Sequence, residues 1–348
     1  MSSAARMVVR ALRNPLSAER LSEEQWTALL TAARAESLLG GLGHRLSDLN
    51  LPAKVSQILA DARADGERAR VQALWEAEMA RRALAPLDVP VVLLKGTAYA
   101  AAGLGAGVGR SIGDLDILVP RDRLAAVQQA LLSAGWEWVK EDAYDDLYYR
   151  RWMHELPPLI HKDRDRMIDV HHTILPLTAR PTPDAAAMIA DSVALGEGLR
   201  GSGSLDQGLR ILAPADMVIH AAAHLFADGD LAGGLRNLWD IDRLLREFGE
   251  RRHFWRDLAW RARRHQLRAP VARALRLAAS LYATPVDEAC AGRRRWSDGL
   301  FERRLLARSG WGSETSPALR LGFYIRSHTL RMPLPMLARH LWIKARQS

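Results

Sequence analysis

The sequence predicts an α+β protein, in which a small mixed β-sheet core follows a helical N-terminal segment and precedes a mostly helical C-terminal region. Apolar residues recur at helical spacing before residue 86 and after Pro214, whereas short apolar runs rich in β-branched residues lie between these points. We therefore expect four segments: a helical segment over 1–85, an α/β core over 86–175, a linker or lid over 176–209 and a helical region over 210–348.

Two helices are expected in the N-terminal segment. Apolar side chains recur at roughly helical spacing over 17–47, and Ser17 is placed to cap the first turn. A second helix is expected over 53–85. It should end before Pro86, because proline cannot donate a backbone hydrogen bond to a continuing helix.

The predicted core begins with a buried strand over 91–94, where half of the residues are β-branched. A second strand covers 114–119, and an amphipathic helix over 121–134 follows, closed by Gly135. Further strands are expected over 136–139, 147–152, 158–161 and 167–171.

The rest of the chain divides into an irregular part and a helical part. Residues 176–209 contain several Pro and Gly and are expected to be irregular. Helices are then expected over 215–227, 234–248, 253–265 and 268–283.

The net charge narrows the classes of ligand. The chain carries 49 Lys and Arg against 40 Asp and Glu, a formal charge of +9. This balance suits phosphate-bearing ligands, nucleic acid or an anionic membrane surface, although a codon bias toward arginine explains it equally well. The stretch 316–348 is basic and has no Asp or Glu. It is interpreted either as a contact with an anionic membrane or nucleic acid, or as an ordinary helix packed on the body.

The single cysteine, Cys290, excludes an internal disulfide and a cysteine-based zinc site, which favours a reducing compartment. No apolar run reaches the ~18 residues of a membrane-spanning helix, and none near the N-terminus has the form of a signal peptide. We therefore expect a soluble cytoplasmic protein without a transmembrane segment.

Two carboxylates are the strongest chemical signal. Asp114 and Asp116 are two residues apart on a predicted strand, so both side chains should point to the same face. Carboxylates this close repel each other unless a cation lies between them. A divalent cation such as Mg²⁺ takes oxygen ligands and leaves positions for phosphate oxygens. The spacing therefore predicts a metal site of the kind used in phosphoryl transfer.

Asp169 is the expected third acid. It lies at the centre of the apolar strand over 167–171, where an unpartnered carboxylate is costly to bury. If that strand lies beside the one carrying Asp116, Asp169 can complete the metal site or take a proton from an attacking hydroxyl.

Five residues are expected to bind phosphate. Gly96 allows close approach of the backbone, Lys95 supplies charge and Thr97 supplies a hydroxyl at the start of a helix. Arg110 and Ser111 precede the acidic pair and are placed to contact a triphosphate.

These segments together resemble the DNA polymerase β-like nucleotidyltransferase superfamily, and more narrowly its bacterial branch called nucleotidyltransferase family 5. The resemblance covers about residues 20–280 and is carried by the segments 94–96, 110–119, 154–159, 168–171, 215–224 and 238–241.

The resemblance implies transfer of a nucleoside monophosphate from an NTP, such as ATP, with release of pyrophosphate and with Mg²⁺ or Mn²⁺ as cofactor. Asp114, Asp116 and Asp169 match the metal-binding acids of the superfamily, while Gly96 and Thr97 loosely match its phosphate-binding pair. The acceptor stays open between a small molecule, a sugar, an RNA end and a protein side chain.

Histidines offer a second kind of site. His154, His161, His171 and His172 are close in sequence, and either a zinc site or a role for His171 in orienting Asp169 or binding phosphate is consistent with them. A helical pair at 220 and 224 has metal-ligand spacing but lacks the adjacent glutamate of metalloproteases, which favours core histidines.

The main alternative to an enzyme is a non-catalytic protein that binds a nucleotide or a partner and retains the same fold. Three acids on core strands argue against it, since a descendant without turnover has no reason to keep them clustered. An RNA-binding module is a further alternative, but the sequence has no RNA-binding aromatic motif.

Overall fold

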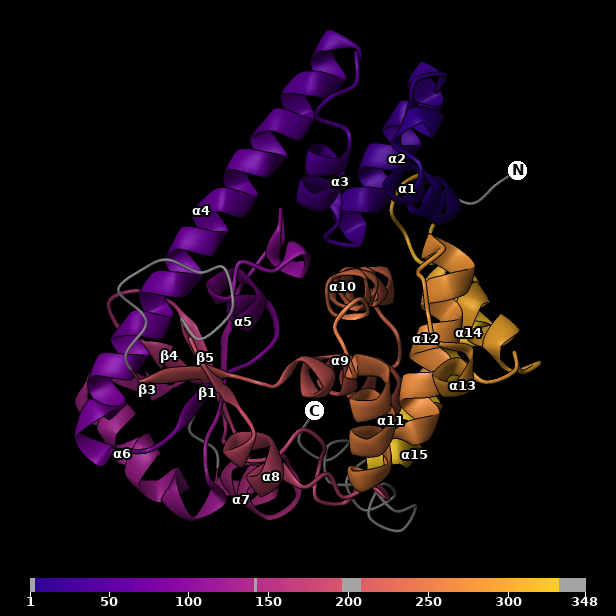
Figure 1. Cartoon of the computed structure of the whole chain (residues 1–348). Helices are drawn as coiled ribbons and strands as arrows, with labels where there is room; N and C mark the ends of the chain where they lie inside the picture. Colours follow the sequence, from indigo (N-terminus) through magenta and orange to yellow (C-terminus); the bar gives the residue numbers. More distant parts are fainter. Residues whose placement is uncertain (1–3, 141–142, 196–207, 332–348) are drawn as a thin grey trace.

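The computed structural model describes residues 4–140, 143–195 and 208–331. Figure 1 shows a β-sheet with the long helix α4 along one side and a group of C-terminal helices beside it. The N-terminal helices α1–α3 lie at the far end of α4, and α1 (Ala4–Arg13) also packs on α12 (Arg268–Tyr282). The first helix thus contacts the group of C-terminal helices.

Seven short strands form one sheet in the order β3-β4-β5-β2-β1-β7-β6. β2 and β5 are parallel, as are β1 and β7, and the other neighbours are antiparallel. The predicted α+β fold with a mixed sheet is therefore confirmed. The strands are β1 (Val91–Leu93), β2 (Leu115–Leu118), β3 (Trp136–Trp138), β4 (Leu159–His161), β5 (Met167–His171), β6 (Val193–Ala194) and β7 (Leu209–Ile211).

The N-terminal segment is helical, but its first predicted helix is wrong in detail. Residues 17–47 form α2 (Glu23–Ala35) and α3 (Leu39–Arg45), separated by Ser37, whose φ of +54° interrupts the helix. The cap of α2 is Ser22, whose hydroxyl accepts a hydrogen bond from Gln25 N while the Gln25 side chain accepts from Ser22 N. The second prediction is confirmed, because α4 covers Ala53–Leu84.

One predicted strand is a helix. Residues 147–152, expected to be a strand, belong to α7 (Ala143–Trp152). The aromatic residues that suggested a strand serve a helix equally well. Tyr148 and Trp152 lie four residues apart on one side of the helix. Their ring centroids are 5.6 Å apart in an edge-to-face contact.

Residues 176–209 are less irregular than expected. They contain α8 (Ala185–Ala190), capped by the Asp184 side chain, and β6, which extends the sheet by pairing with β7. The strand β7 begins inside this segment at Leu209 and lies parallel to β1, so the sheet continues past the expected boundary. The rest of the segment, 196–207, lies outside the described residues.

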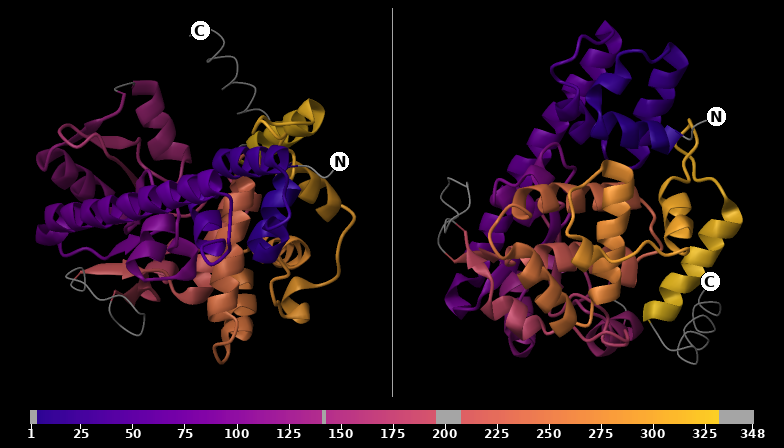
Figure 2. Two further views of the ribbon diagram at one scale, coloured as in Figure 1. Left: turned by 90° about the horizontal axis from the view of Figure 1, so that it is seen from above. Right: turned by 45° about the vertical axis from the view of Figure 1, so that its right-hand side comes forward.

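The expected C-terminal helices are confirmed, although the one predicted over 215–227 ends in a turn of π-helix at His224–Asp228. Figure 2 shows these helices grouped beside the sheet, with α4 crossing from one group to the other. They are α9 (Pro214–Ala223), α10 (Gly234–Phe248), α11 (Phe254–Arg264), α12, α13 (Glu288–Ala291), α14 (Asp298–Leu305) and α15 (Pro317–Arg331).

Buried apolar side chains from the N-terminal helices, the sheet and the C-terminal helices form one contiguous cluster. The basic stretch begins in α15, where Phe323 is buried and Arg326 donates to the carbonyls of Phe226 and Gly229. Its remainder, 332–348, lies outside the described residues. Among the helices that are described, none combines the length and the apolar character needed to cross a membrane.

Candidate active site

Two of the predicted acids lie side by side. Asp116 on β2 is directly opposite Asp169 on β5, and these strands are parallel neighbours. Residues opposite each other on neighbouring strands project from the same face of the sheet, so the two carboxylates share one surface. Asp116 is buried and Asp169 is half-buried.

Asp114 lies at the edge of this arrangement. It precedes β2 by one residue and is exposed, and a Cβ added at the neighbouring Gly113 would meet nothing within 4 Å. The third predicted acid is therefore on the open side of the strand end.

Lys95 joins the two acids to the first helix of the core. Its Nζ lies 2.6 Å from Asp116 Oδ1, and the residue opens α5 (Lys95–Ala101) directly after β1. Its φ of +47° is in the left-handed region, which costs of the order of 1–3 kcal/mol for a residue with a side chain and is most often found at functional sites. The chain thus holds this ammonium against Asp116 in a backbone conformation that most lysines avoid.

The electrostatic environment gives the two strand acids different pKa values. Burial works against the charge of Asp116, but Lys95 and His171 hold its pKa well below the usual range. Burial raises the pKa of Asp169 to about 7, and repulsion from Glu155 and Asp116 adds to the shift. One carboxylate is therefore fixed as an anion, while the other takes and releases a proton near neutral pH.

Three further side chains form a chain of contacts that begins at Asp116. His171 Nε2 is 3.0 Å from Asp116 Oδ1, and His171 Nδ1 is 3.3 Å from Glu155 Oε2. His154 Nε2 is 3.5 Å from the same glutamate oxygen, and the two imidazole rings are stacked with centroids 5.3 Å apart. Of the four clustered histidines, the structure brings these two together.

The other two histidines of that group lie elsewhere. His161 packs edge-on against Trp136, with ring centroids 5.0 Å apart. Burial and the charge of Arg121 lower the pKa of His172 to about 4, so that ring stays neutral. A four-histidine zinc site is therefore not formed within the described residues.

Arg110 lies in a closed ion pair. Its Nε is 3.0 Å from Asp240 Oδ2 on α10, both side chains are buried, and the guanidinium lies over the Tyr99 ring at 5.7 Å. It also fills the space beside Gly96, where an added Cβ would lie 1.7 Å from Arg110 Nη1. The glycine thus makes room for an arginine in this structure, and Arg110 ties its loop to α10.

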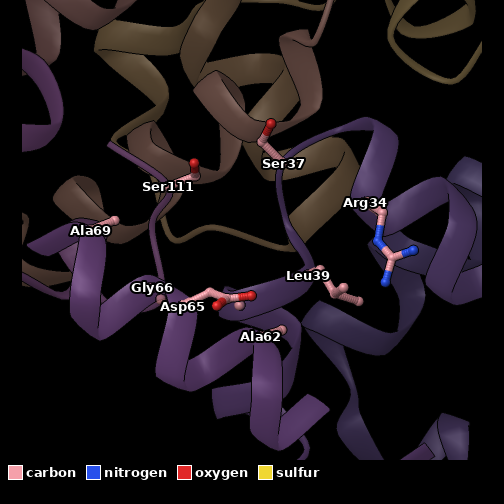
Figure 3. A pocket seen from close by; sticks show the side chains of 10 residues that line it. Arg34, Ser37, Leu39, Ala62, Asp65, Gly66, Ala69 and Ser111 are labelled. Carbon is pink, nitrogen blue, oxygen red and sulfur yellow. The ribbon is translucent and has the colours of Figure 1, made fainter. Parts of the chain in front are cut away.

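Thr97 and Ser111 differ in exposure. Thr97 is buried, and its hydroxyl has no hydrogen-bond partner among the residues that the structure describes. Ser111 is exposed and lines a cavity of about 230 Å³ with Ser37 and Asp65 (Figure 3). Of the predicted phosphate contacts, Ser111 is therefore exposed, whereas the Thr97 hydroxyl is buried and Lys95 is paired with Asp116.

The helix α9 and the π-helical turn after it carry two more histidines, whose pKa values are affected by Lys95. His220 is buried and His224 is half-buried, and their pKa values are lowered by burial and then by the charge of Lys95. The pKa of His224 falls to about 3, so it is neutral at physiological pH. Their spacing of four residues predicted a shared helix face; their position near Lys95 depends on tertiary packing.

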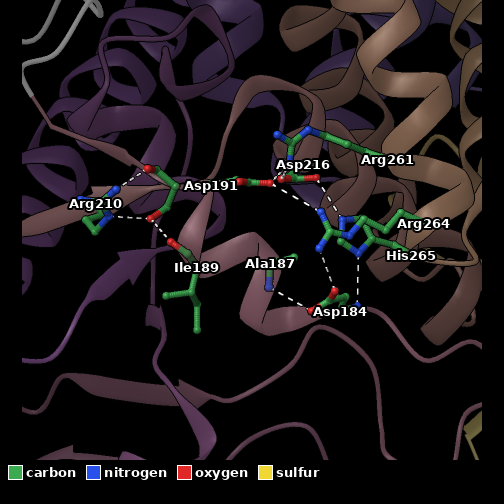
Figure 4. A network of polar contacts seen from close by, with 10 residues as sticks. Asp184, Ala187, Ile189, Asp191, Arg210, Asp216, Arg261, Arg264 and His265 are labelled. Carbon is green, nitrogen blue, oxygen red and sulfur yellow. Dashed lines mark hydrogen bonds and ion pairs between the residues drawn. The ribbon is translucent and has the colours of Figure 1, made fainter.

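A buried polar network holds α9 in place (Figure 4). Asp216, in the first turn of α9, is fully buried and accepts a hydrogen bond from Arg261 Nη1 at 2.7 Å. Arg261 also contacts Asp191 at 2.9 Å, and His265 Nε2 lies 3.4 Å from Asp216 Oδ1. A buried acid that is paired in this way is costly to disturb, so the network fixes the helix that faces the site.

Glu155 is the site residue that sequence reasoning did not single out. It lies outside the named strands and reaches the site through an isolated bridge to His171. The available signal was the charged pair His154-Glu155 in a segment that already resembled the family. Nothing local in the sequence indicated that this pair would lie beside β5.

Comparison with known proteins identifies the family of this chain. A family described as "Uncharacterised nucleotidyltransferase" matches residues 22–283, which include every strand and the helices α2–α12. No curated protein matches the chain. Because the match covers most of the chain and contains the paired acids on β2 and β5, this protein is a member of that nucleotidyltransferase family.

Proposed function

We propose that this nucleotidyltransferase moves a nucleoside monophosphate from an NTP to the hydroxyl of an acceptor, releases pyrophosphate and requires a divalent metal ion. The observation that carries the proposal is the register that sets Asp116 beside Asp169 on neighbouring parallel strands. The acceptor stays open between a small molecule, a sugar, an RNA end and a protein.

The donor set fits a hard divalent cation. Asp116 and Asp169 offer carboxylate oxygens on one face of the sheet, and Asp114 offers a third from the exposed strand end. Mg²⁺ prefers such oxygen ligands and retains positions for phosphate oxygens. When bound, the ion would neutralise charge on the transferred phosphoryl group.

The chain's own residues have separate roles in the proposal. Asp169 accepts the proton of the acceptor hydroxyl at one of its carboxylate oxygens. Lys95 leaves Asp116 when cations take its place and then donates to phosphate oxygens. The buried hydroxyl of Thr97 lies in the first turn of α5 and can donate to the same group.

The test is a thermal-shift screen with each of the four NTPs and Mg²⁺. We expect one NTP to raise the melting temperature of the wild type only when the metal is present, because a ligand that binds the folded state stabilises it. Asp116→Asn and Asp169→Asn should abolish that shift, while Asp122→Asn, an exposed acid outside the site, should keep it. Equal shifts in all four proteins would exclude the proposed site.

The closed position of Arg110 favours one alternative, a protein that binds a nucleotide or a partner without turnover. The guanidinium that was expected to meet the triphosphate is paired with Asp240. The two functions differ in whether pyrophosphate is released. Release would be measured with sugar, nucleoside, RNA and protein acceptors. If an NTP with metal raises the melting temperature but no acceptor gives pyrophosphate, the result would favour the alternative.

A further inference from the structure

A group of three side chains next to the acidic pair has the composition of a separate metal site. His154, Glu155 and His171 each present one nitrogen or oxygen ligand atom, and these three atoms all lie within 4.8 Å of one another. The group supplies two nitrogen ligands and one oxygen ligand, whereas the acidic pair supplies oxygen ligands alone. Its composition is therefore different from the one that Mg²⁺ prefers.

The spacing of the ligand atoms matches a tetrahedral ion. A metal held about 2.0–2.1 Å from each ligand in a tetrahedral site keeps the ligand atoms about 3.3–3.4 Å apart. Glu155 Oε2 lies 3.3 Å from His171 Nδ1 and 3.5 Å from His154 Nε2. Two of the three distances therefore match this spacing, and the third, between the two histidine nitrogens, is within 4.8 Å.

The hydrogen bonding of His171 leaves one ring nitrogen facing Glu155. Asp116, held as an anion, can only accept, so His171 Nε2, which lies 3.0 Å from it, is the donor of that contact. The other ring nitrogen, Nδ1, is buried and makes no hydrogen bond within the described residues. It lies 3.3 Å from the Glu155 carboxylate, so a cation held by these two atoms would satisfy both of them.

The contact with Asp116 is itself typical of a metal ligand. A histidine that binds a metal through one nitrogen usually donates the other N–H to a carboxylate, which orients the ring. Here Asp116 would orient His171 in that way. An ion at Nδ1 would in turn hold the imidazole against Asp116.

The backbone fixes the three residues relative to one another. Glu155 and His171 form an antiparallel bridge, and Leu156 N donates to Val170 O at 2.9 Å. His172 N donates to His154 O, also at 2.9 Å. The side chains therefore project from paired backbone segments, and preorganised ligands bind a metal more tightly than flexible ones.

We propose that His154, Glu155 and His171 form a binding site for a borderline transition metal such as Zn²⁺, separate from the Mg²⁺ site and sharing with it the His171–Asp116 contact. A fourth position would be left for water or a substrate atom. This site does not depend on nucleotidyl transfer, because its ligands come from the chain alone.

The experiment is a titration of the metal-free wild type with Co²⁺, which replaces Zn²⁺ and shows a strong visible absorption band when it is tetrahedral. We expect one equivalent to bind and produce the band. Glu155→Gln, which keeps the shape of the side chain, and His154→Ala should each weaken binding by at least about tenfold, since each removes a ligand.

Two controls keep the result specific. His44→Ala removes an exposed histidine far from the cluster in sequence, and Asp114→Asn removes an exposed acid of the Mg²⁺ site; both should bind Co²⁺ as the wild type does. Melting curves without metal establish that each variant is folded. No visible band in the wild type, or an unchanged affinity in folded Glu155→Gln, would overturn the proposal.

The two proposals fail separately. If the histidine site is wrong, the Mg²⁺-dependent NTP shift persists while Co²⁺ gives no band. If nucleotidyl transfer is wrong, the Co²⁺ band remains in the wild type and in the two control variants, while no NTP changes the melting temperature.

Discussion

The Lys95–Asp116 and Arg110–Asp240 pairs both lie beside the start of α5, and each joins a cation to a buried acid. They differ in access to solvent. The Lys95 side chain is 25% exposed and that of Arg110 is 8% exposed. Lys95 and His171 outweigh burial and lower the pKa of Asp116, whereas burial outweighs Arg110 and raises the pKa of Asp240. We infer that the first pair can exchange its cation for a ligand and that the second is a structural link.

The largest effect on stability is expected from Arg110→Ala. Removal of one partner of a buried ion pair leaves an uncompensated charge, so we expect a loss of about 3–5 kcal/mol in the free energy of unfolding. Urea denaturation measures it. In the double variant Arg110→Ala/Asp240→Asn, the loss in unfolding free energy should be smaller than the sum of the losses in the two single variants. A loss below about 1 kcal/mol, accompanied by a missing NTP shift, would instead make Arg110 a phosphate ligand.

Gly96→Ala should have a smaller effect through the same link. The new methyl group would lie 1.7 Å from Arg110 Nη1, and overpacking of this kind costs about 1–3 kcal/mol. In an Arg110→Ala background the same change should cost much less, because the space is then free. Gly113→Ala is the matched control, since its Cβ meets nothing within 4 Å. A loss of the same size at both glycines would contradict the packing argument.

The third prediction concerns the pH dependence of stability, in which Asp169 should differ from Asp116. The pKa of Asp169 is about 7 in the folded protein and starts from 3.8, so the folded state binds this proton more tightly. Its contribution to stability is complete below about pH 4 and is lost as the pH rises toward 7, with a slope of at most about 1.4 kcal/mol per pH unit.

Asp169→Asn should remove this dependence without changing that of other groups. The measurement is the difference in unfolding free energy between wild type and variant from pH 4 to 8, in a chelator so that no metal binds. A difference that does not vary with pH would show that Asp169 is ionised throughout.

Lys95→Met is expected to change stability least. The Lys95 side chain is 25% exposed, and His171 still contacts Asp116 after the change, so the loss should be smaller than that of Arg110→Ala. The NTP shift should nevertheless weaken, because the ammonium is the proposed phosphate contact. Lys162→Met is the control, since that lysine is exposed on the β4–β5 connection. A large loss of stability with an intact NTP shift would make Lys95 a structural residue like Arg110.

The sequence predicted those parts of the site that depend on local periodicity. The strand pattern at 114–119 placed Asp116 among apolar residues, and the strand at 167–171 did the same for Asp169. The two acids lie side by side because these strands are neighbours, and both strands were predicted from the sequence. The helices over 53–84 and 234–248 were predictable for the same reason, since apolar residues recur along them.

Other features depend on contacts between distant residues and leave no local pattern. Arg110 and Asp240 are 130 positions apart, and their pairing could not be read from either segment. Glu155 reaches His171 through a single bridge outside the named strands. The strand predicted at 147–152 failed because the same aromatic residues suit a strand and the face of a helix, and tertiary packing decides between them.

The central claim, that the Lys95–Asp116 pair exchanges ligands and the Arg110–Asp240 pair does not, can be tested directly with Mn²⁺. The binding of Mn²⁺ in the presence of an NTP is measured by the loss of the free-ion electron paramagnetic resonance signal, in a Glu155→Gln background that removes the histidine site. We predict that Asp116→Asn abolishes binding and that folded Asp240→Asn retains it. Binding that survives Asp116→Asn, or that is lost equally in both variants, would contradict the account.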